Sequence, residues 1–162
     1  MNQTIWTVKE ANVEHVERWF DFTKAVQADF YNMDLVNNES YCSAIRKNIS
    51  RGTAIYVEDR SLPDSPIIGA MIYSPNQNHI GWFAVHPKYR RMGVGSSIME
   101  YMLNKLVDAR EIKVKTFLYD DNYGKAARSF YVKNGFIGKD ILRDEEEYPH
   151  PVQVFIKSLR EE

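Results

Sequence analysis

The sequence predicts a single domain of mixed α/β class, in which helices flank a mixed, mostly antiparallel sheet. Its 162 residues are a typical length for one domain. Three β-prone runs follow one another between residues 53 and 85, which is typical of an antiparallel meander, and helices alternate with strands after Pro87. Because no repeat, linker or change of composition divides the chain, we expect one domain over residues 1–162.

The predicted strands are short runs rich in β-branched and aromatic residues, bounded by turn residues. They lie at residues 5–8, 53–58, 67–73, 79–85, 112–118, 136–137 and 152–157, which makes a sheet of about seven strands. A polar, proline-containing loop at residues 59–66 joins two of them as antiparallel neighbours. The run at residues 79–85 ends before Pro87, because proline cannot donate to a sheet ladder.

About four helices are predicted, at residues 13–30, 40–50, 96–107 and 125–134. The first has apolar side chains at helical spacing: Val13, Val16, Trp19, Phe20, Val26 and Phe30. Asn38 or Ser40 can cap the second helix, and Gly52 and Gly135 can supply the left-handed residue after the second and the fourth. The apolar face of the third consists of Ile98, Met102 and Leu106.

Composition excludes several classes of function. The 21 Lys and Arg residues nearly balance the 22 Asp and Glu residues, giving a net charge of −1, so no basic field is available for nucleic acid. A single cysteine, Cys42, excludes a disulfide framework and a cysteine-rich zinc site, and we expect no metal. The N-terminus lacks signal-peptide features and no segment approaches the roughly 20 apolar residues of a membrane span. We therefore expect a cytoplasmic protein that binds neither nucleic acid nor membrane.

The most informative segment joins the strand at residues 79–85 to the following helix. Gly93 and Gly95 let main-chain amides approach a ligand closely, and the start of the helix, with its positive dipole end, suits a pyrophosphate. A Walker loop would need lysine where Ser96 stands, and a dinucleotide fingerprint would need glycine at Ile98. Both of those interpretations fail, and a glycine turn with nothing bound is the structural alternative.

The pattern Arg90-x-x-Gly93-x-Gly95 resembles the Q/R-x-x-G-x-G/A loop of the GNAT superfamily of acetyl-CoA-dependent N-acyltransferases. Val85, Pro87 and Tyr89 reproduce the residues that precede this loop in the family. A second segment, ARSFYVKNGF at residues 127–136, resembles the family's A-x-x-L/F-Y-x-x-x-G-F helix end. The two motifs occur in the family's order, and the order of elements agrees over nearly the whole chain.

The resemblance implies a sheet splayed between its fourth and fifth strands, with coenzyme A in the opening. The pantetheine would pair with the backbone of Phe83, Ala84 and Val85, and the pyrophosphate would rest on loop amides. The loop residues implied are Arg90, Arg91, Met92, Gly93, Val94, Gly95 and Ser96. Asn122 is a further candidate for a cofactor contact, although it lies two residues before the family's usual asparagine and is equally compatible with a turn.

The resemblance also implies that Tyr131 lies near the thioester sulfur and protonates the departing thiolate. A thiol has a pKa of about 8.5 and tyrosine one of about 10, so a positioned hydroxyl can stabilise the thiolate by hydrogen bonding. The alternative role for Tyr131 is packing beside Phe130. Many relatives carry a glutamate base on the fourth or fifth strand, but residues 79–85 and 112–118 contain none. The other candidates for the base are His79, His86, Glu147 and His150.

These implications predict an N-acetyltransferase that transfers an acetyl group from acetyl-CoA directly to a primary amine of a small molecule or peptide. No local motif specifies the acceptor; the acidic run at residues 144–147 would either steer a cationic amine or form a solvated loop. The alternatives are a non-catalytic acetyl-CoA-binding sensor or regulatory module, because no base is evident, and a structural protein whose glycine loop is empty. The resemblance leaves a homodimer open.

Overall fold

The computed structural model describes residues 6–30, 33–106, 109–117, 125–143 and 151–159. Its contacts divide the chain into two compact units. The first consists of Met1–Tyr73 with Trp82–Lys105, and the second of Ser74–Gly81 with Leu106–Glu162. Strand β4 (His79–Val85) therefore contributes residues to both units.

Within the described residues, seven strands are hydrogen-bonded in the order β1-β2-β3-β4-β5-β7-β6. The strands are β1 (Lys9–Glu10), β2 (Ala54–Glu58), β3 (Ile67–Ser74), β4 (His79–Val85), β5 (Glu111–Phe117), β6 (Ile137–Leu142) and β7 (Val152–Ser158). The α-helices are α1 (Val16–Val26), α2 (Glu39–Arg51), α3 (Val94–Lys105) and α4 (Lys125–Lys133). Short 3₁₀ helices are η1 (Val13–His15), η2 (Gln27–Phe30), η3 (Leu35–Asn37) and η4 (Pro87–Tyr89). The predicted mixed, mostly antiparallel sheet with flanking helices is confirmed.

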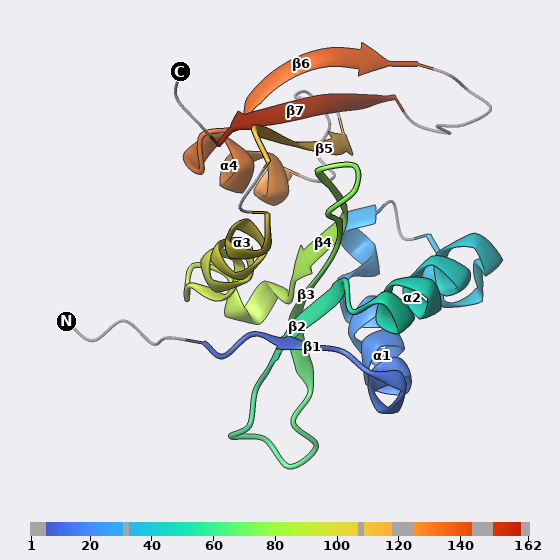
Figure 1. Cartoon of the computed structure of the whole chain (residues 1–162). Helices are drawn as coiled ribbons and strands as arrows, with labels where there is room; N and C mark the ends of the chain where they lie inside the picture. The colour runs from blue at the N-terminus through green and yellow to red at the C-terminus, as the bar shows by residue number, and fades with distance from the viewer. Residues whose placement is uncertain (1–5, 31–32, 107–108, 118–124, 144–150, 160–162) are drawn as a thin grey trace. The chain divides into compact units, whose positions relative to one another are not determined.

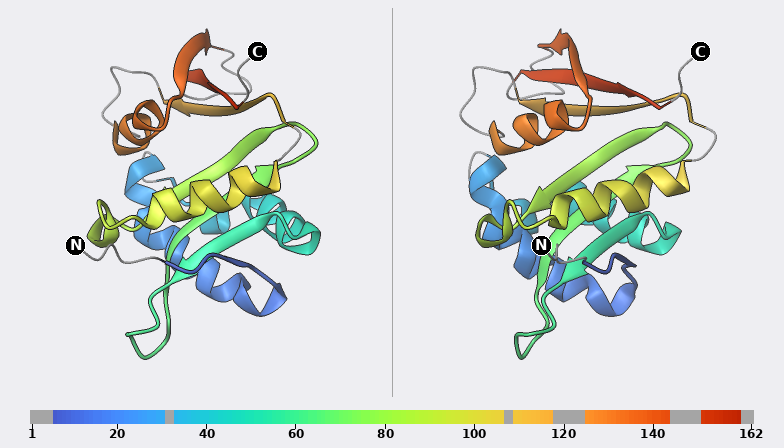
Figure 2. Two further views of the ribbon diagram at one scale, coloured as in Figure 1. Left: turned by 60° about the vertical axis from the view of Figure 1, so that its left-hand side comes forward. Right: turned by 90° about the vertical axis from the view of Figure 1, so that its left-hand side faces the viewer.

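In the first unit, helices cover both faces of the strands. Figure 1 shows α1 and α2 on one side of β2, β3 and β4 and α3 on the other, and both views of Figure 2 agree. β1 pairs with β2, and β2 with β3, in antiparallel registers. Because each face packs on helices, side chains that point either way are buried, and seven of the eight residues of β3 are buried.

Two apolar layers hold this unit together. On the α1 and α2 side, Trp19 and Ile45 are fully buried against strand residues such as Tyr56. On the α3 side, the predicted helix face is confirmed, because Ile98 and Met102 have no exposed surface. Burying side chains of this size contributes about 1.5–3 kcal/mol each to the free energy of unfolding.

The predicted helix over residues 13–30 is broken into three pieces. The Asn12 side chain accepts from the Glu14 amide, and His15 Nδ1 accepts from the Asn12 amide, so a capping box forms around η1 before α1 begins. Val13 lies in this turn and is 80% exposed, so its assignment to the apolar helix face is wrong. Trp19 and Val26 of the predicted face are buried.

Two other N-terminal predictions differ in outcome. The strand expected at residues 5–8 is wrong for its described part, since strand pairing begins at Lys9, opposite Tyr56. The second helix is confirmed: the Asn38 side chain accepts from the Tyr41 amide, and Gly52 ends the helix with a φ of 77°. Asn38 rather than Ser40 is thus the cap.

The second unit is built on β5, β7 and β6. β5 pairs antiparallel with β7 along its whole length, and β6 pairs antiparallel with β7 around a bulge. β4 and β5 are parallel, and their register joins His79 to Lys113 and Ile80 to Val114, at the start of β4.

The edge strand of the second unit, β6, is largely exposed. Five of the six residues of β6 are exposed, and Lys139 and Asp140 lie at its middle. Charged side chains on an exposed edge discourage pairing with another strand. Within this unit, α4 lies beside β5 and β7 (Figure 1), with Tyr131 packed on Phe155.

Candidate functional site

In the first unit, the end of β4 leads through a tight loop into α3. β4 carries Phe83, Ala84 and Val85 at its end, and η4 follows at once. Two residues of the loop have left-handed backbone, Arg91 with a φ of 64° and Gly93 with a φ of 86°. Alternation of right- and left-handed residues turns successive amides toward one side of the chain, which is the geometry of an anion nest.

The helix that follows supplies further amides. α3 begins at Val94, two residues before the predicted start, and the Ser97 amide donates to the Gly93 carbonyl at 3.0 Å. The amides of Val94, Gly95 and Ser96 therefore precede the first helical hydrogen bond and have no acceptor within the helix. Their partial positive charge, at the positive end of the helix dipole, favours a phosphate.

The first turn of α3 fits against β3 at a glycine. A Cβ atom added to Gly69 would lie 2.5 Å from Val94 Cγ1 and 3.0 Å from Ile98 Cδ1. Val94 is 1% exposed, so it has no room to move outward into solvent without shifting the helix. Gly69 thus sets how closely the amides at the start of α3 approach the sheet.

Residues remote in sequence hold the loop from outside. The Trp6 indole Nε1 donates to the Met92 carbonyl oxygen at 2.8 Å, and its ring meets the Tyr89 ring edge to face, with centroids 6.2 Å apart. The Tyr89 hydroxyl donates to the Asp59 carboxylate. Neither Trp6 nor Asp59 was expected at the site, and no local pattern could have revealed them, because 86 positions separate Trp6 from Met92.

In the second unit, Tyr131 lies on α4 and is 3% exposed. Its ring contacts Phe136 and Phe155, with centroid distances of 5.3 and 6.5 Å. Burial raises the pKa of the Tyr131 hydroxyl above its ordinary value, so the group keeps its proton. The helix ends as predicted, with Gly135 at a φ of 88°.

The histidines differ in what their rings can accept. His15 and His86 each use Nδ1 to accept a backbone N–H, from Asn12 and Lys88 respectively. The His79 side chain makes no hydrogen bond to a described residue, and burial, followed by the charge of Lys115, lowers its pKa. His79 is therefore neutral at pH 7, with a ring nitrogen available to take a proton. Asn122, Glu147 and His150 lie outside the described residues.

An aromatic cluster surrounds Trp82 of β4 on the α1 and α2 side. Ring centroids of Trp19, Phe22, Phe30 and Tyr41 lie within 5.7–6.0 Å of the Trp82 ring. The Tyr41 hydroxyl forms a hydrogen bond with the Thr23 hydroxyl, and burial raises the pKa of Tyr41 to about 12. Trp82 Nε1 is buried without a hydrogen-bond partner among the described residues. These aromatic residues pack in and against the core of the first unit.

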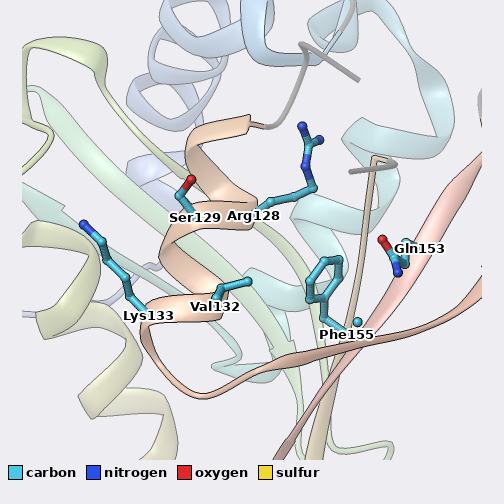
Figure 3. A pocket seen from close by; sticks show the side chains of 7 residues that line it. Arg128, Ser129, Val132, Lys133, Gln153 and Phe155 are labelled. Carbon is cyan, nitrogen blue, oxygen red and sulfur yellow. The ribbon is translucent and has the colours of Figure 1, made fainter. Parts of the chain in front are cut away.

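An open hollow of about 560 Å³ lies between α4 and strands β6 and β7 (Figure 3). Its lining residues are Arg128, Ser129, Val132, Lys133, Gly138, Gln153 and Phe155. Val132 faces Phe155 across the hollow, whereas Arg128 and Lys133 extend in different directions. Because the two cations do not converge, the hollow has no common point for an anion.

Two kinds of feature are absent from the described ranges, a metal-binding cluster and a membrane-spanning helix. No cluster of three or more His, Cys, Asp or Glu side chains capable of holding a metal ion occurs there. None of the helices described is both long and apolar enough to span a bilayer.

The sequence profile of the acetyltransferase (GNAT) domain matches residues 51–138, more than half of the chain. No curated protein matches the chain. Among solved structures, a GNAT-family acetyltransferase from Bacillus cereus is 23% identical, with a TM-score of 0.70 over 97% of this chain and 100% of its own. Ard1 from Thermoplasma volcanium is 17% identical, with a TM-score of 0.72 over 98% and 100%. A Drosophila melanogaster polyamine N-acetyltransferase is 15% identical, with a TM-score of 0.67 over 94% and 99%.

The chain therefore belongs to the GNAT acetyltransferase family, and it is an acetyltransferase. The profile match includes β4, the loop and α3, as well as α4 with Tyr131. At these identities the solved structures establish the fold, which is the one that the sequence motifs predict.

Proposed function

We propose that the protein transfers an acetyl group from acetyl-CoA to a primary amine of a small molecule or peptide, by direct transfer. The observation that carries this proposal is the backbone of residues 90–96. Left-handed residues at Arg91 and Gly93, followed by the first turn of α3, supply amides without intrahelical acceptors. Such amides suit the diphosphate of coenzyme A, and the side chains of Arg90 and Arg91 would add positive charge.

The pantetheine arm is proposed to bind along the end of β4. Phe83, Ala84 and Val85 lie there, just before the loop, so one strand would serve both parts of the cofactor. An extended arm with amide groups can hydrogen-bond to a strand in the manner of an added strand. A backbone amide of β4 would then polarise the thioester carbonyl, because charge develops on that oxygen in the tetrahedral intermediate.

Tyr131 is proposed as the residue that assists the leaving group. Its raised pKa keeps the hydroxyl protonated across the pH range in which the enzyme would work. A protonated hydroxyl can donate a hydrogen bond to the thiolate of coenzyme A and deliver a proton as the thiolate departs. Burial also removes competing water, which strengthens such a hydrogen bond.

The acceptor amine must lose a proton before or during attack, because a lysine-type amine has a pKa of about 10.4. Among the described histidines, we propose His79 as the base that takes this proton, directly or through water. Its lowered pKa leaves the imidazole neutral, and its ring is not engaged in a hydrogen bond to a described residue. His86 is less suited, because its Nδ1 already accepts the Lys88 amide.

The test combines cofactor binding with turnover. Calorimetric titration with coenzyme A should saturate at one site, and incubation with acetyl-CoA and a panel of amines should release free thiol with at least one of them. Mass spectrometry of the mixture should then find an acetylated amine. Tight binding without amine-stimulated release would instead favour the non-catalytic sensor. Absence of binding would remove the proposed function altogether.

A further inference from the structure

Trp6 joins the N-terminal segment to the loop that precedes α3, within the first unit. We propose that Trp6 is a positioning residue for the cofactor diphosphate, because its indole fixes the direction in which the Gly93 amide points. This inference rests on the proposed function and adds to it a residue that lies outside both family motifs.

The geometry of one peptide group carries the inference. Trp6 Nε1 donates to the carbonyl oxygen of Met92 at 2.8 Å. The described chain has no cis peptide bond, and in a planar trans peptide the C=O and the following N–H point in opposite directions. Fixing the Met92 carbonyl toward Trp6 therefore fixes the Gly93 N–H away from Trp6, toward the side on which an anion can bind.

This peptide needs a restraint from outside the loop. Its rotation changes ψ of Met92 and φ of Gly93, and glycine adopts either sign of φ at similar cost. The Gly93 carbonyl is held by the Ser97 amide at 3.0 Å, but that bond restrains only the next peptide. A rotated Met92–Gly93 peptide would present its carbonyl oxygen to the diphosphate, where two negative groups repel each other.

Trp6 contacts residues that are anchored at the base of the loop between β2 and β3. Its ring packs edge to face on Tyr89, whose hydroxyl donates to the Asp59 carboxylate. The Asp59 amide donates to the Pro66 carbonyl at 2.9 Å, at the base of the loop between β2 and β3. Hydrogen bonds from Ser61 and then Tyr89 lower the pKa of Asp59, so the carboxylate stays charged and keeps accepting. The loop before α3 is thus connected, through Trp6, Tyr89 and Asp59, to the end of strand β2.

A purely structural role for Trp6 makes a different prediction from a positioning role. General damage to the first unit would reduce activity with every acyl donor. A misdirected Gly93 amide would weaken the binding only of acyl donors that carry a diphosphate. Acetyl-CoA and S-acetyl-pantetheine share the same thioester and differ in the nucleotide diphosphate, so the pair separates the two roles.

The experiment compares the wild-type protein with Trp6→Phe, which keeps an aromatic ring beside Tyr89 and removes the N–H. A second variant carries benzothienylalanine at position 6, which keeps the bicyclic shape and replaces the N–H by sulfur. Calorimetry gives the Kd for coenzyme A, and steady-state kinetics give kcat/KM for both donors. We expect both variants to weaken coenzyme A binding about five- to tenfold, the effect of one hydrogen bond, while kcat/KM for S-acetyl-pantetheine stays within about twofold of wild type.

Variants that bind coenzyme A as tightly as wild type would overturn the inference while leaving the proposed function intact. An equal decrease in kcat/KM for both acyl donors would overturn the inference too, because it would show a structural role for Trp6. If the wild-type protein itself bound no coenzyme A, the proposed function would fail, and this inference would fail with it.

Discussion

Gly69→Ala tests the positioning of α3 from the side of the sheet, without replacing any residue proposed to contact the cofactor. The added Cβ would lie 2.5 Å from Val94 Cγ1 and 3.0 Å from Ile98 Cδ1, whereas ordinary contacts are 3.4–4 Å. Relief of the Val94 contact therefore needs a shift of about 1 Å, which α3 must supply because Val94 is buried and β-branched side chains are stiff at χ1.

We expect Gly69→Ala to lower the free energy of unfolding by about 1–3 kcal/mol, the usual cost of overpacking a core. Since a hydrogen bond weakens steeply outside its narrow range of distances, the same displacement of the Val94 to Ser96 amides should raise the Kd for coenzyme A about tenfold. Chemical denaturation and calorimetric titration measure the two quantities.

Gly138→Ala is the matched control, because its Cβ would lie 2.7 Å from Gln153 Nε2, the end of a flexible side chain. That side chain can move aside, so we expect stability within about 0.5 kcal/mol of wild type and unchanged affinity for coenzyme A. The double variant Gly69→Ala with Val94→Ala should recover affinity, since it removes the clashing methyl group. A Gly69→Ala protein as stable and as tightly binding as wild type would refute the reasoning.

The remaining predictions concern the proton-handling residues. Tyr131→Phe should lower kcat about 10²-fold while changing the Kd for coenzyme A little, because the hydroxyl acts on the leaving group; unchanged kcat would remove Tyr131 from the mechanism. His79→Gln should lower kcat/KM about 10²-fold and abolish the acidic limb of its pH profile, and a profile identical to wild type would exclude His79 as the base. Burial, then the charge of Arg18, lowers the pKa of His15, so the unfolded chain takes up a proton first as pH falls below about 6.5 and the folded state loses stability there. Denaturant titrations should therefore show a smaller fall in the free energy of unfolding between pH 7 and 5.5 for His15→Gln than for wild type. An equal fall in the two proteins would contradict the assignment of this pH dependence to His15.

Local signals predicted most of the fold. Gly52 and Gly135 end their helices with positive φ, and Asn38 caps α2, because each of these roles depends on neighbours within a few residues. The apolar spacing of Ile98 and Met102 likewise identified the buried face of α3. The start of α3 was placed two residues late, because Val94 and Gly95 were assigned to the loop on the strength of the glycines.

The sequence pattern did not predict several features of the fold, above all the contacts between residues far apart in the chain. The helix expected over residues 13–30 has 3₁₀ turns, η1 and η2, at its two ends, and a capping box of Asn12 and His15 lies at its start. The contact of Gly69 with Val94 and the bond from Trp6 to Met92 depend on which strand lies beneath which helix. Hydrophobic spacing does not encode that pairing, so the residues that hold the loop emerge only from the folded chain.

The central claim is that main-chain amides of the loop and of the first turn of α3 bind the diphosphate of coenzyme A. Amide chemical shifts in ¹⁵N-labelled protein, followed by NMR during titration with coenzyme A and separately with pantetheine, test this claim most directly. We predict that the amides of Gly93, Gly95 and Ser96 shift with coenzyme A and not with pantetheine. Unchanged chemical shifts of these three amides while coenzyme A binds would contradict the claim.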